Sequence, residues 1–342
     1  MNILLVCEYW YGTGGWSYKH ALERLGCSVD VFDYRRSYFS AGATLPLVSA
    51  LTRRINRRIM NEEFEQAVAA SKPDVIFVLK GETIREETLR RVKEKHRPFL
   101  VQWYPDGPFN RENRNATKDS IASIPLFDIY YIYARSLVEP LRAAGAKRVE
   151  YLPFCYDPEM LRMPEAMSEE DVARYSADVV FAGTWEPERE RWLDAVADFD
   201  LAVWGNMWDR VPVSRPVRKR WRGYAVYGEE ISKLFAVSKI HLNFLRLQNR
   251  DSHNVRTLEI PGFGGFLLTQ RSREQAEELF TEGEEIACFD TVDELRGKIR
   301  YYLEHEEERR AVAARGHARA LREHTVENRL QRVLDDIRHA AR

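Results

Sequence analysis

Short apolar runs of strand length alternate with longer amphipathic segments along most of this chain, and this alternation restricts the possible folds more than any other feature. Nearly continuous apolar runs are typical of parallel strands covered on both faces, and the amphipathic segments are typical of the covering helices. The pattern therefore predicts a doubly wound α/β fold. The predicted strands of the first half are Ile3–Cys7, Val29–Phe32, Asp74–Leu79, Phe99–Trp103 and Ile129–Tyr133, and the predicted helices are Ser17–Leu25, Leu47–Ala70, Glu86–Lys95 and Leu137–Ala144.

The same alternation starts again after a polar, acidic stretch between Asp157 and Ala177, which we interpret as a linker. A length of 342 residues is enough for about two domains with their own cores. Because ligands bind at the carboxyl ends of parallel strands, two such domains facing each other predict a crevice between them. The predicted strands of the second half are Val179–Ala182, Leu201–Trp204, Ile240–Phe244, Phe266–Thr269 and Ile286–Phe289, and the predicted helices are Glu188–Val196, Glu229–Val237, Arg273–Phe280, Val292–Glu304, Glu308–Arg322 and, after Thr325 as N-cap, Glu327–Arg342.

Composition excludes several classes of protein. Lys and Arg number 52 against 53 Asp and Glu, so a nucleic-acid-binding protein held by bulk charge is disfavoured, and any bound anion must be gripped by a local pocket. No C-x-x-C pair, D-x-D at a strand end or His pair at ligand spacing points to a metal. Scattered cysteines and the lack of a signal peptide or membrane-spanning run predict a cytoplasmic protein, with peripheral membrane contact left open. The cysteines are Cys7, Cys27, Cys155 and Cys288.

A glycine-rich loop, residues 8–17, follows the first predicted strand and precedes a helix. Gly14 and Gly15 would let the backbone approach a ligand, and a helix N-terminus favours anions. Three neighbouring aromatic residues at the strand end, Tyr9, Trp10 and Tyr11, favour a ligand-facing loop over an ordinary strand-to-helix turn. The dinucleotide fingerprint G-x-G-x-x-G is incomplete here, which makes a dehydrogenase a weak alternative.

Two further strand ends carry candidate residues. Asp106 lies in a Pro-Asp-Gly turn after the fourth strand, where it makes the turn or faces a ligand. Gly183 and Thr184 end a strand of the second half, and Arg189 follows in the first turn of a helix. A cation is unfavourable at that helix end, so an anion such as a diphosphate docking there would explain it, although a solvated helix face is the alternative.

The segment from Asn249 to Thr269 carries the strongest signal. If Asn254 opens a helix, Glu259 lies about one and a half turns into it, where its carboxylate can accept two hydroxyl hydrogen bonds from a ribose. Backbone N–H groups near residues 254–257 can meet phosphate oxygens, and Arg256 adds positive charge.

This segment also shows a family resemblance. The string Arg256–Thr269 resembles the R-x-x-E-x-x-x-x-G-G-x-x-L region of the CgeB-like (spore maturation protein) glycosyltransferases. Other pieces agree in order along nearly the whole chain, and they are Lys72–Gly81, Trp103–Pro108, Tyr151–Asp157, Val180–Gly183, Leu279–Glu285 and His324–Arg329.

The resemblance implies a GT-B fold of two facing Rossmann-like domains, with residues 1–157 on the acceptor side, 158–325 binding the nucleotide sugar, and a final helix, 326–342, crossing back to the first domain. Related retaining enzymes carry an E-x₇-E motif, and the matching positions here are Asp251 and Glu259. They also place two cations on the diphosphate. The matching positions are Thr184, which cannot serve as a cation, and Arg189.

The implied function is metal-independent transfer of a sugar from a nucleoside diphosphate sugar, such as a UDP sugar, to an acceptor hydroxyl, without any other cofactor. An inverting reaction needs a base, for which Asp106 is the candidate with Glu8 behind it. Trp204 lines the base pocket or belongs to the core, and His253 polarises a phosphate or is polar surface. Two basic clusters have alternative interpretations. Residues 53–58 form a solvated helix face or a membrane contact, and Arg215–Arg222 is an exposed loop or a lid that contacts the donor phosphates.

Other functions stay open at this stage. The departures at Thr184 and Asp251 give some weight to a non-enzymatic nucleotide-sugar sensor or partner subunit. A GT-B-fold sugar epimerase or a phosphorylase-like enzyme is a further alternative, and a homodimer is possible.

Overall fold

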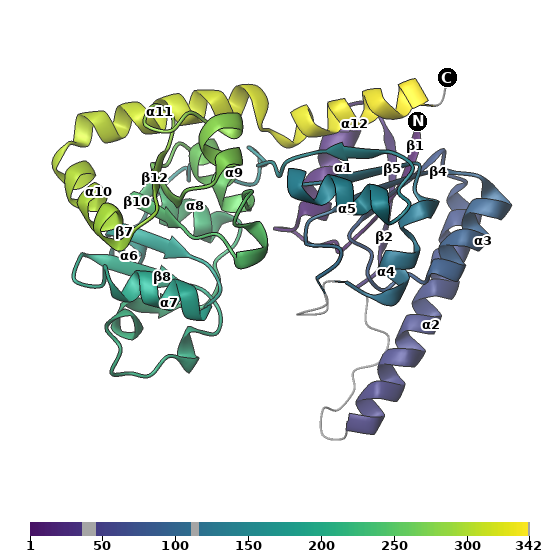
Figure 1. Cartoon of the computed structure of the whole chain (residues 1–342), viewed down its shortest axis with the longest axis horizontal. Helices are drawn as coiled ribbons and strands as arrows, with labels where there is room; N and C mark the ends of the chain where they lie inside the picture. The colour runs from purple at the N-terminus through teal and green to yellow at the C-terminus, as the bar shows by residue number, and fades with distance from the viewer. Residues whose placement is uncertain (36–45, 111–115, 341–342) are drawn as a thin grey trace. The chain divides into compact units, whose positions relative to one another are not determined.

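The computed structural model describes residues 1–35, 46–110 and 116–340, and the chain divides into two compact units (Figure 1). Unit 1 consists of Met1–Pro153 and Leu330–Arg342, and unit 2 consists of Phe154–Arg329. Each unit holds one six-stranded sheet whose neighbouring strands are all parallel in the described parts of the chain. The predicted α/β fold with two parallel sheets is confirmed.

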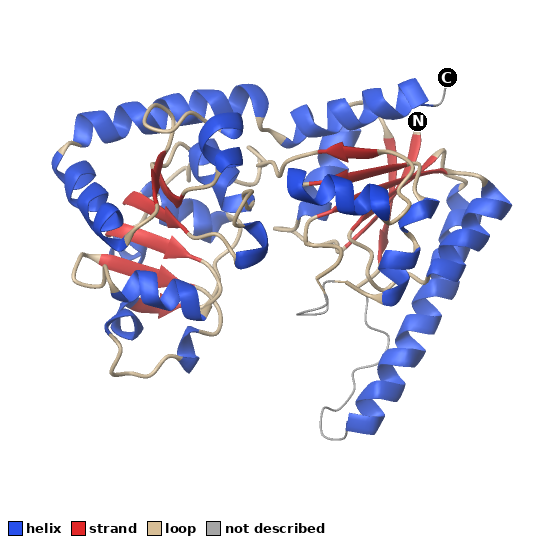
Figure 2. Ribbon diagram, in the orientation of Figure 1, coloured by secondary structure: helices blue, strands red, loops and turns tan. Residues whose placement is uncertain are grey.

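The sheet of unit 1 has the strand order β2-β1-β3-β4-β5-β6. Helices cover both of its faces (Figure 2), which explains why the central strands are buried almost completely. The strand order reverses between β1 and β3, and ligands of open α/β sheets bind at the carboxyl ends of strands at such a switch point. The strands are β1 (Asn2–Cys7), β2 (Ser28–Asp33), β3 (Val75–Leu79), β4 (Phe99–Tyr104), β5 (Ile129–Ile132) and β6 (Val149–Tyr151).

The end of the chain also belongs to unit 1. Helix α12 (Val326–Ala340) begins in unit 2, and its residues from Leu330 onward count with unit 1. There the Tyr131 hydroxyl donates a hydrogen bond of 2.9 Å to the Asp336 carboxylate, and Arg148 forms an ion pair with the same group. The other helices of unit 1 are α1 (Gly14–Arg24), α2 (Pro46–Ser71), α3 (Glu86–His96), α4 (Lys118–Ala122) and α5 (Val138–Ala143).

The sheet of unit 2 has the strand order β12-β11-β10-β7-β8-β9, so its switch point lies between β7 and β10. Side chains of β7 alternate between two cores: Val179 and Phe181 pack with α7 and α10, whereas Val180 packs with α8 and α9. The strands are β7 (Ala177–Ala182), β8 (Leu201–Trp204), β9 (Trp221–Gly223), β10 (Ser238–Asn243), β11 (Leu267–Gln270) and β12 (Ala287–Phe289), and the helices are α6 (Glu169–Tyr175), α7 (Pro187–Asp194), α8 (Glu229–Ala236), α9 (Val255–Phe263), α10 (Val292–Glu304) and α11 (Glu306–Glu323).

The predicted linker is partly wrong. Helix α6 lies within it, because Ser168 and Asp171 form a reciprocal capping box and Tyr175 anchors the helix in the core. The predicted helix at Arg273–Phe280 is a π-helix, Glu274–Leu279. The predicted cap at Thr325 is present: its hydroxyl accepts a hydrogen bond from the N–H of Asn328, and the Asn328 side-chain oxygen accepts one from the N–H of Thr325.

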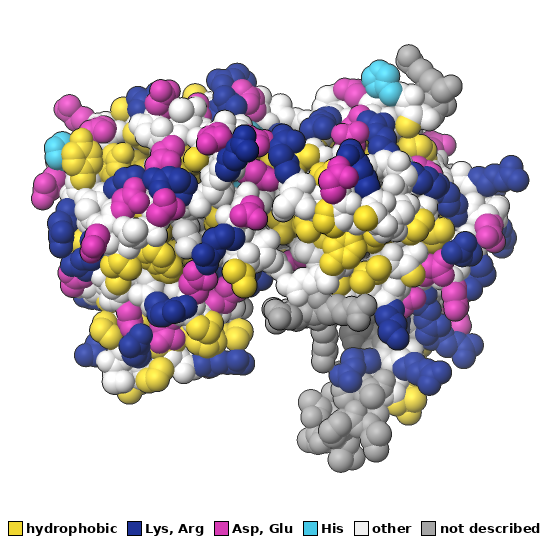
Figure 3. Space-filling model, in the orientation of Figure 1, with side chains coloured by type: hydrophobic (Ala, Val, Ile, Leu, Met, Phe, Trp, Pro, Cys, Tyr) yellow, Lys and Arg dark blue, Asp and Glu magenta, His cyan; other side chains and the backbone are white. Residues whose placement is uncertain are grey.

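Charged side chains of both signs are intermixed over the face drawn in Figure 3, as the balanced composition requires. Among the helices in the described ranges, none combines the length and the apolar character needed to cross a membrane.

Candidate functional site

The switch point of unit 2 is held together by one buried arginine. Arg189, from the first turn of α7, donates 2.9 Å to the carbonyl of Thr184 after β7 and 3.1 Å to the carbonyl of Phe244 after β10. Its residue is only 8% exposed, so most of the guanidinium is closed off from solvent. The cation at this helix end is therefore explained in part by backbone carbonyl groups, which sequence reasoning did not foresee.

The surroundings of Arg189 nevertheless disfavour its charged form. Burial lowers the pKa of Arg189 to about 10, the Glu186 carboxylate opposes this shift, and the neighbouring cations Arg246 and Arg256 add to it. The Nε atom is buried without a hydrogen-bond partner among the described residues, 4.0 Å from Glu186 Oε2. Three arginines thus lie near one another at the switch point, and each of them has a glutamate carboxylate beside it.

Two glycines allow the β7 and β8 ends to approach each other. Gly205 has a φ of +151°, and a Cβ built on it would lie 2.0 Å from the carbonyl oxygen of Gly183. A Cβ on Gly183 would in turn lie 2.7 Å from the ring of Phe181. The predicted ligand-facing role of Gly183 is therefore joined by a packing requirement.

Ion pairs connect the start of α7 with the segment after β10. Arg246 Nε lies 2.7 Å from Glu186 Oε1, and Arg250 pairs with Glu188. Each side chain is at least partly exposed, so solvent and ions reach these pairs. Sequence analysis missed Arg246, although a cation directly after a strand at a ligand-binding edge was the available signal.

Helix α9 begins at Asn254, as predicted. The Asn254 side chain accepts a hydrogen bond of 3.2 Å from the N–H of Thr257, and the N–H of Asn254 donates 3.4 Å to the Thr257 hydroxyl. This capping box corrects one expectation, because the N–H groups of residues 254 and 257 are used internally. The groups left for an anion are those of Val255 and Arg256, which an α-helix does not satisfy itself.

A buried polar network lies beneath the start of α9. Gln275 Oε1 accepts hydrogen bonds from the hydroxyls of Thr257 (2.6 Å) and Thr269 (3.1 Å). The Asn243 amide, at the end of β10, donates 3.1 Å to the Thr269 hydroxyl and accepts 2.9 Å from the Asn254 amide. The network therefore fixes the N-terminus of α9 to the ends of β10 and β11.

Glu259 lies on the second turn of α9, as expected, and forms an ion pair with Arg256. Both side chains are partly exposed, at 17% and 22%. Arg256 also donates 3.4 Å to the carbonyl of Ala182 at the end of β7. Asp251, the other half of the predicted motif, is exposed on the loop before the helix.

Two residues expected near the ligand are buried. Trp204 is 2% exposed and packs against Tyr175, so its place is in the core, on the β8 face covered by α8 and α9. His253 is fully buried and is not surface. Its Nε2 accepts a hydrogen bond of 3.1 Å from the N–H of Phe154, and its Nδ1 lies 3.1 Å from Glu274 Oε2. Burial lowers the pKa of His253, which favours its neutral form.

The switch point of unit 1 holds a second set of charged groups. Arg35, just after β2, lies 2.6 Å from Glu82 Oε1 and 3.7 Å from Glu8 Oε2. Lys80, at the end of β3, lies 2.6 Å from Asp106 Oδ2 after β4. The predicted base is thus held by a lysine that sequence analysis did not single out, and the pair is mostly shielded, at 16% and 19% exposure.

The two glycines predicted in the first loop have different surroundings. A Cβ on Gly15 would lie 2.3 Å from the carbonyl oxygen of Glu8, so Gly15 is required by the close packing of α1 on β1. A Cβ on Gly14 would meet nothing within 4 Å, so Gly14 leaves open space at the start of α1.

Part of each basic cluster has structural partners. In the cluster on α2, the Arg57 guanidinium lies 2.6 Å from the Asp119 carboxylate of α4. In the other cluster, Arg215 pairs with Glu190 and Asp194 of α7. The arginine-rich segment is thereby anchored to α7, which argues against a mobile lid.

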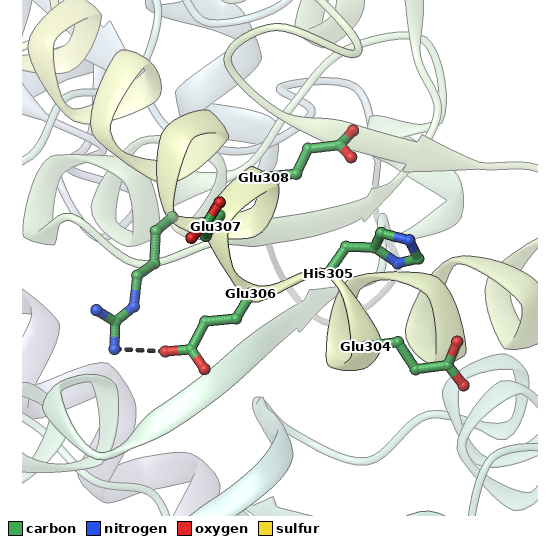
Figure 4. A pocket seen from close by; sticks show the side chains of 6 residues that line it. Glu304, His305, Glu306, Glu307 and Glu308 are labelled. Carbon is green, nitrogen blue, oxygen red and sulfur yellow. Dashed lines mark ion pairs between the residues drawn. The ribbon is translucent and has the colours of Figure 1, made fainter.

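An open hollow lies at the turn between α10 and α11 and is lined by Glu304–Glu308 and Arg310. Figure 4 shows Glu306 paired with Arg310, while Glu304 and Glu308 extend to the opposite side. Within the part of the chain that the structure describes, no group of three or more His, Cys, Asp or Glu side chains is placed to hold a metal ion.

Residues 189–335 match the sequence profile of the family described as "Glycosyl transferase-like". The matched segment begins at the buried arginine of the switch point and includes Arg246, α9 and Glu259. The match covers most of unit 2 and the first part of α12. No curated protein matches the sequence.

Solved structures show the same fold over almost the whole chain. The UDP-glucose complex of HepE from Anabaena has 13% identity and a TM-score of 0.66, covering 99% of this chain and 100% of that one. Sucrose-phosphate synthase from Thermosynechococcus elongatus has 11% identity and a TM-score of 0.68, covering 99% of each chain. A putative UDP-N-acetylglucosamine 2-epimerase from Listeria monocytogenes has 12% identity and a TM-score of 0.60, covering 98% and 95%. The fold and the domain match confirm the prediction of a GT-B glycosyltransferase.

Proposed function

We propose that this glycosyltransferase takes its sugar from a nucleoside diphosphate sugar bound at the carboxyl edge of the unit 2 sheet. The observation that carries the proposal is the placement of three arginines at the switch point, beside the N-terminus of α9. Arg189 and Arg246 lie 4.0 Å and 2.7 Å from the Glu186 carboxylate, and Arg256 donates to the carbonyl of Ala182 at the end of β7. HepE was solved with UDP and with UDP-glucose, so uridine nucleotides are the first donors to test.

The diphosphate gains negative charge as its bond to the sugar breaks, so groups that stabilise it more in the transition state accelerate transfer. Arg246 and Arg256 are exposed enough to touch phosphate oxygens, and the first turn of α9 offers backbone N–H groups. Arg189 acts from below, as a buried cation that also holds the strand ends. In this proposal these groups supply the positive charge without a metal ion.

Glu259 recognises the ribose in this proposal. Its carboxylate would leave Arg256 and accept hydrogen bonds from the two ribose hydroxyls, which releases the Arg256 guanidinium for a phosphate. Asp251 would lie near the donor sugar, on the loop before α9. Related retaining enzymes have a longer Glu at the position of Asp251 and a cation at the position of Thr184. In this proposal Arg246 supplies the cation that Thr184 cannot.

The acceptor hydroxyl forms the new bond to the anomeric carbon while the bond from that carbon to the phosphate oxygen breaks, and the nucleoside diphosphate leaves with the electron pair. In an inverting reaction Asp106 takes the hydroxyl proton. Lys80 keeps that carboxylate in place, 2.6 Å away. A retaining reaction passes the proton to the departing phosphate and needs no such base.

Thermal unfolding with UDP, GDP and dTDP tests the donor site directly. A ligand at a hundredfold excess over its Kd stabilises the folded protein by about 2.7 kcal/mol. Glu259→Ala is expected to remove most of this stabilisation, whereas Glu277→Ala, an exposed carboxylate on the π-helix, is the matched control and keeps it. If none of the nucleotides shifts the wild-type transition, the proposed donor site is wrong.

Incubation with a UDP sugar but no acceptor separates transfer from the alternatives. Conversion of one UDP sugar into another would identify an epimerase instead of a transferase, and tight donor binding without turnover on any acceptor would favour a sensor.

The ordered sequence motifs further support the CgeB-like subfamily, and the four free cysteines agree with a cytoplasmic location. A possible homodimer is tested by the molecular mass in solution.

A further inference from the structure

The loop between β1 and α1 follows the carboxyl end of β1 and carries large exposed aromatic side chains. Trp10 is 46% exposed and Tyr11 is 54% exposed. The Tyr11 ring stands edge-on to the Trp16 ring, with centroids 5.2 Å apart. We call Trp10, Tyr11 and Trp16 the aromatic platform. Exposed aromatic clusters mark binding sites more often than chance positions on a surface.

The aromatic platform is rigid, which distinguishes it from a loose loop. The Thr13 hydroxyl donates 2.8 Å to the carbonyl of Trp10 and lies 3.2 Å from that of Glu8, and the N–H of Thr13 donates 3.1 Å to Trp10. Gly12, with a φ of +102°, lets the loop turn against the indole, since a Cβ there would lie 3.0 Å from that ring. A preformed surface loses little conformational entropy when a ligand binds.

A carboxylate lies directly beside the exposed indole. Trp10 Nε1 donates a hydrogen bond of 3.1 Å to Glu8 Oε1, which orients the ring and places both groups on one surface. A flat apolar face next to a hydrogen-bond acceptor matches a pyranose ring, which presents C–H groups on one face and hydroxyls at its edge.

The charges along this edge favour a neutral ligand. Among the described residues at this edge, Arg35 lies beside the carboxylates of Glu82 and Glu8, and Lys80 lies beside that of Asp106. Because Arg35 and Lys80 already have carboxylate partners, a phosphate or sulfate group would have to displace those partners to bind them. Paired acceptors and donors of this kind suit the hydroxyl groups of an uncharged sugar.

We propose, on the basis of the glycosyltransferase function above, that the aromatic platform binds a sugar ring of a neutral carbohydrate acceptor, with Glu8 accepting hydrogen bonds from its hydroxyls. The acceptor is then a glycan chain rather than a phosphorylated lipid or a nucleotide. Asp106 stands two strands from Glu8 along the same edge, where an acceptor held on the platform presents a hydroxyl.

Binding of neutral glucose, mannose and N-acetylglucosamine oligosaccharides to the full chain tests this inference, by saturation-transfer NMR and fluorescence titration. We expect at least one series to bind, and Trp10→Ala to raise its Kd about tenfold, as truncation of a central aromatic contact does. Trp10→Phe keeps a ring but loses the bond to Glu8, so its Kd is expected to lie between the two. Tyr301→Ala removes an aromatic residue of similar exposure, 42%, from α10 of unit 2 and is the control.

Each outcome decides the question. The inference is overturned if none of the oligosaccharides binds at millimolar concentration, if Trp10→Ala binds as tightly as the wild type, or if phosphorylated sugars or anionic vesicles bind more tightly than neutral sugars. The UDP-induced stabilisation, measured on the same samples, keeps the two proposals apart. Loss of sugar binding with UDP stabilisation intact refutes the platform alone, whereas sugar binding without any nucleotide effect refutes the donor site alone.

Discussion

Replacing Gln275 with leucine tests whether the polar network beneath α9 stabilises unit 2. Gln275 is fully buried. Its side chain accepts from Thr257 and Thr269 and donates to the carbonyl of Gln270 (2.9 Å) and the hydroxyl of Ser272 (3.1 Å). Leucine has a similar volume, so the cost of a cavity is small and the result reports on hydrogen bonds.

The magnitude follows from the groups that leucine leaves behind. As donors, the two hydroxyls keep only long contacts: that of Thr257 lies 3.5 Å from Asn254 Oδ1, and that of Thr269 lies 3.4 Å from the carbonyl oxygen of Gln270. Two buried donors with poor partners, at about 1–3 kcal/mol each, give a loss of about 2–6 kcal/mol in the free energy of unfolding. Because the network positions the start of α9, UDP affinity is expected to fall as well.

Urea unfolding followed by circular dichroism measures this change in the transition that contains unit 2. Gln275→Glu is the companion variant: it keeps an acceptor for both threonines but replaces the amide donors by a buried carboxyl group, so it should be at least as destabilising. A loss below about 1 kcal/mol in Gln275→Leu, with unchanged UDP binding, would show that these hydrogen bonds do not hold α9 and would refute the reasoning.

Three other changes give measurable effects. Burial lowers the pKa of His241 to about 4, below its value of about 6.5 in the unfolded chain. The free energy of unfolding is therefore highest above pH 6.5 and falls by about 3 kcal/mol as the pH drops toward 4. Urea titrations at several pH values should show a shallower fall in His241→Leu. Gly205→Ala places a Cβ 2.0 Å from the carbonyl oxygen of Gly183, at a φ of +151°. The resulting strain of at least about 1–3 kcal/mol should lower both the urea midpoint and the affinity for UDP. An unchanged urea midpoint would contradict this geometry. Asp106→Asn should slow an inverting transfer by about a hundredfold or more without changing UDP binding, whereas an unchanged turnover number would exclude Asp106 as the base.

Most strands were predictable because their signal is local. A run such as that of β3 is apolar at every position, since helices cover both faces of the sheet. The two strands that sequence analysis missed, β6 and β9, have three residues each and lie at sheet edges. An edge strand is only partly covered, so its residues need not be apolar and no periodic signal remains.

The candidate site divides in the same way. The cap at Asn254 and the position of Glu259 follow from a short motif, and the structure places both where the spacing predicts. The pairs Lys80–Asp106 and Arg246–Glu186 join residues far apart in the sequence, which meet only because their strands are neighbours in the sheets. The sequence places His253 in a loop and gives no sign of its burial, because its partners Phe154 and Glu274 are distant in sequence and meet it only in the folded unit.

The pair between Arg246 and Glu186 has a consequence for how strongly a diphosphate is held. Under the proposed function, a ligand that reaches Arg246 displaces the Glu186 carboxylate, so the protein contains its own competing anion. Binding then exchanges one ionic contact for another, and added salt weakens the contact that is lost as well as the one that is gained. Donor affinity should therefore depend only weakly on ionic strength, which would let the enzyme release a highly charged product instead of trapping it.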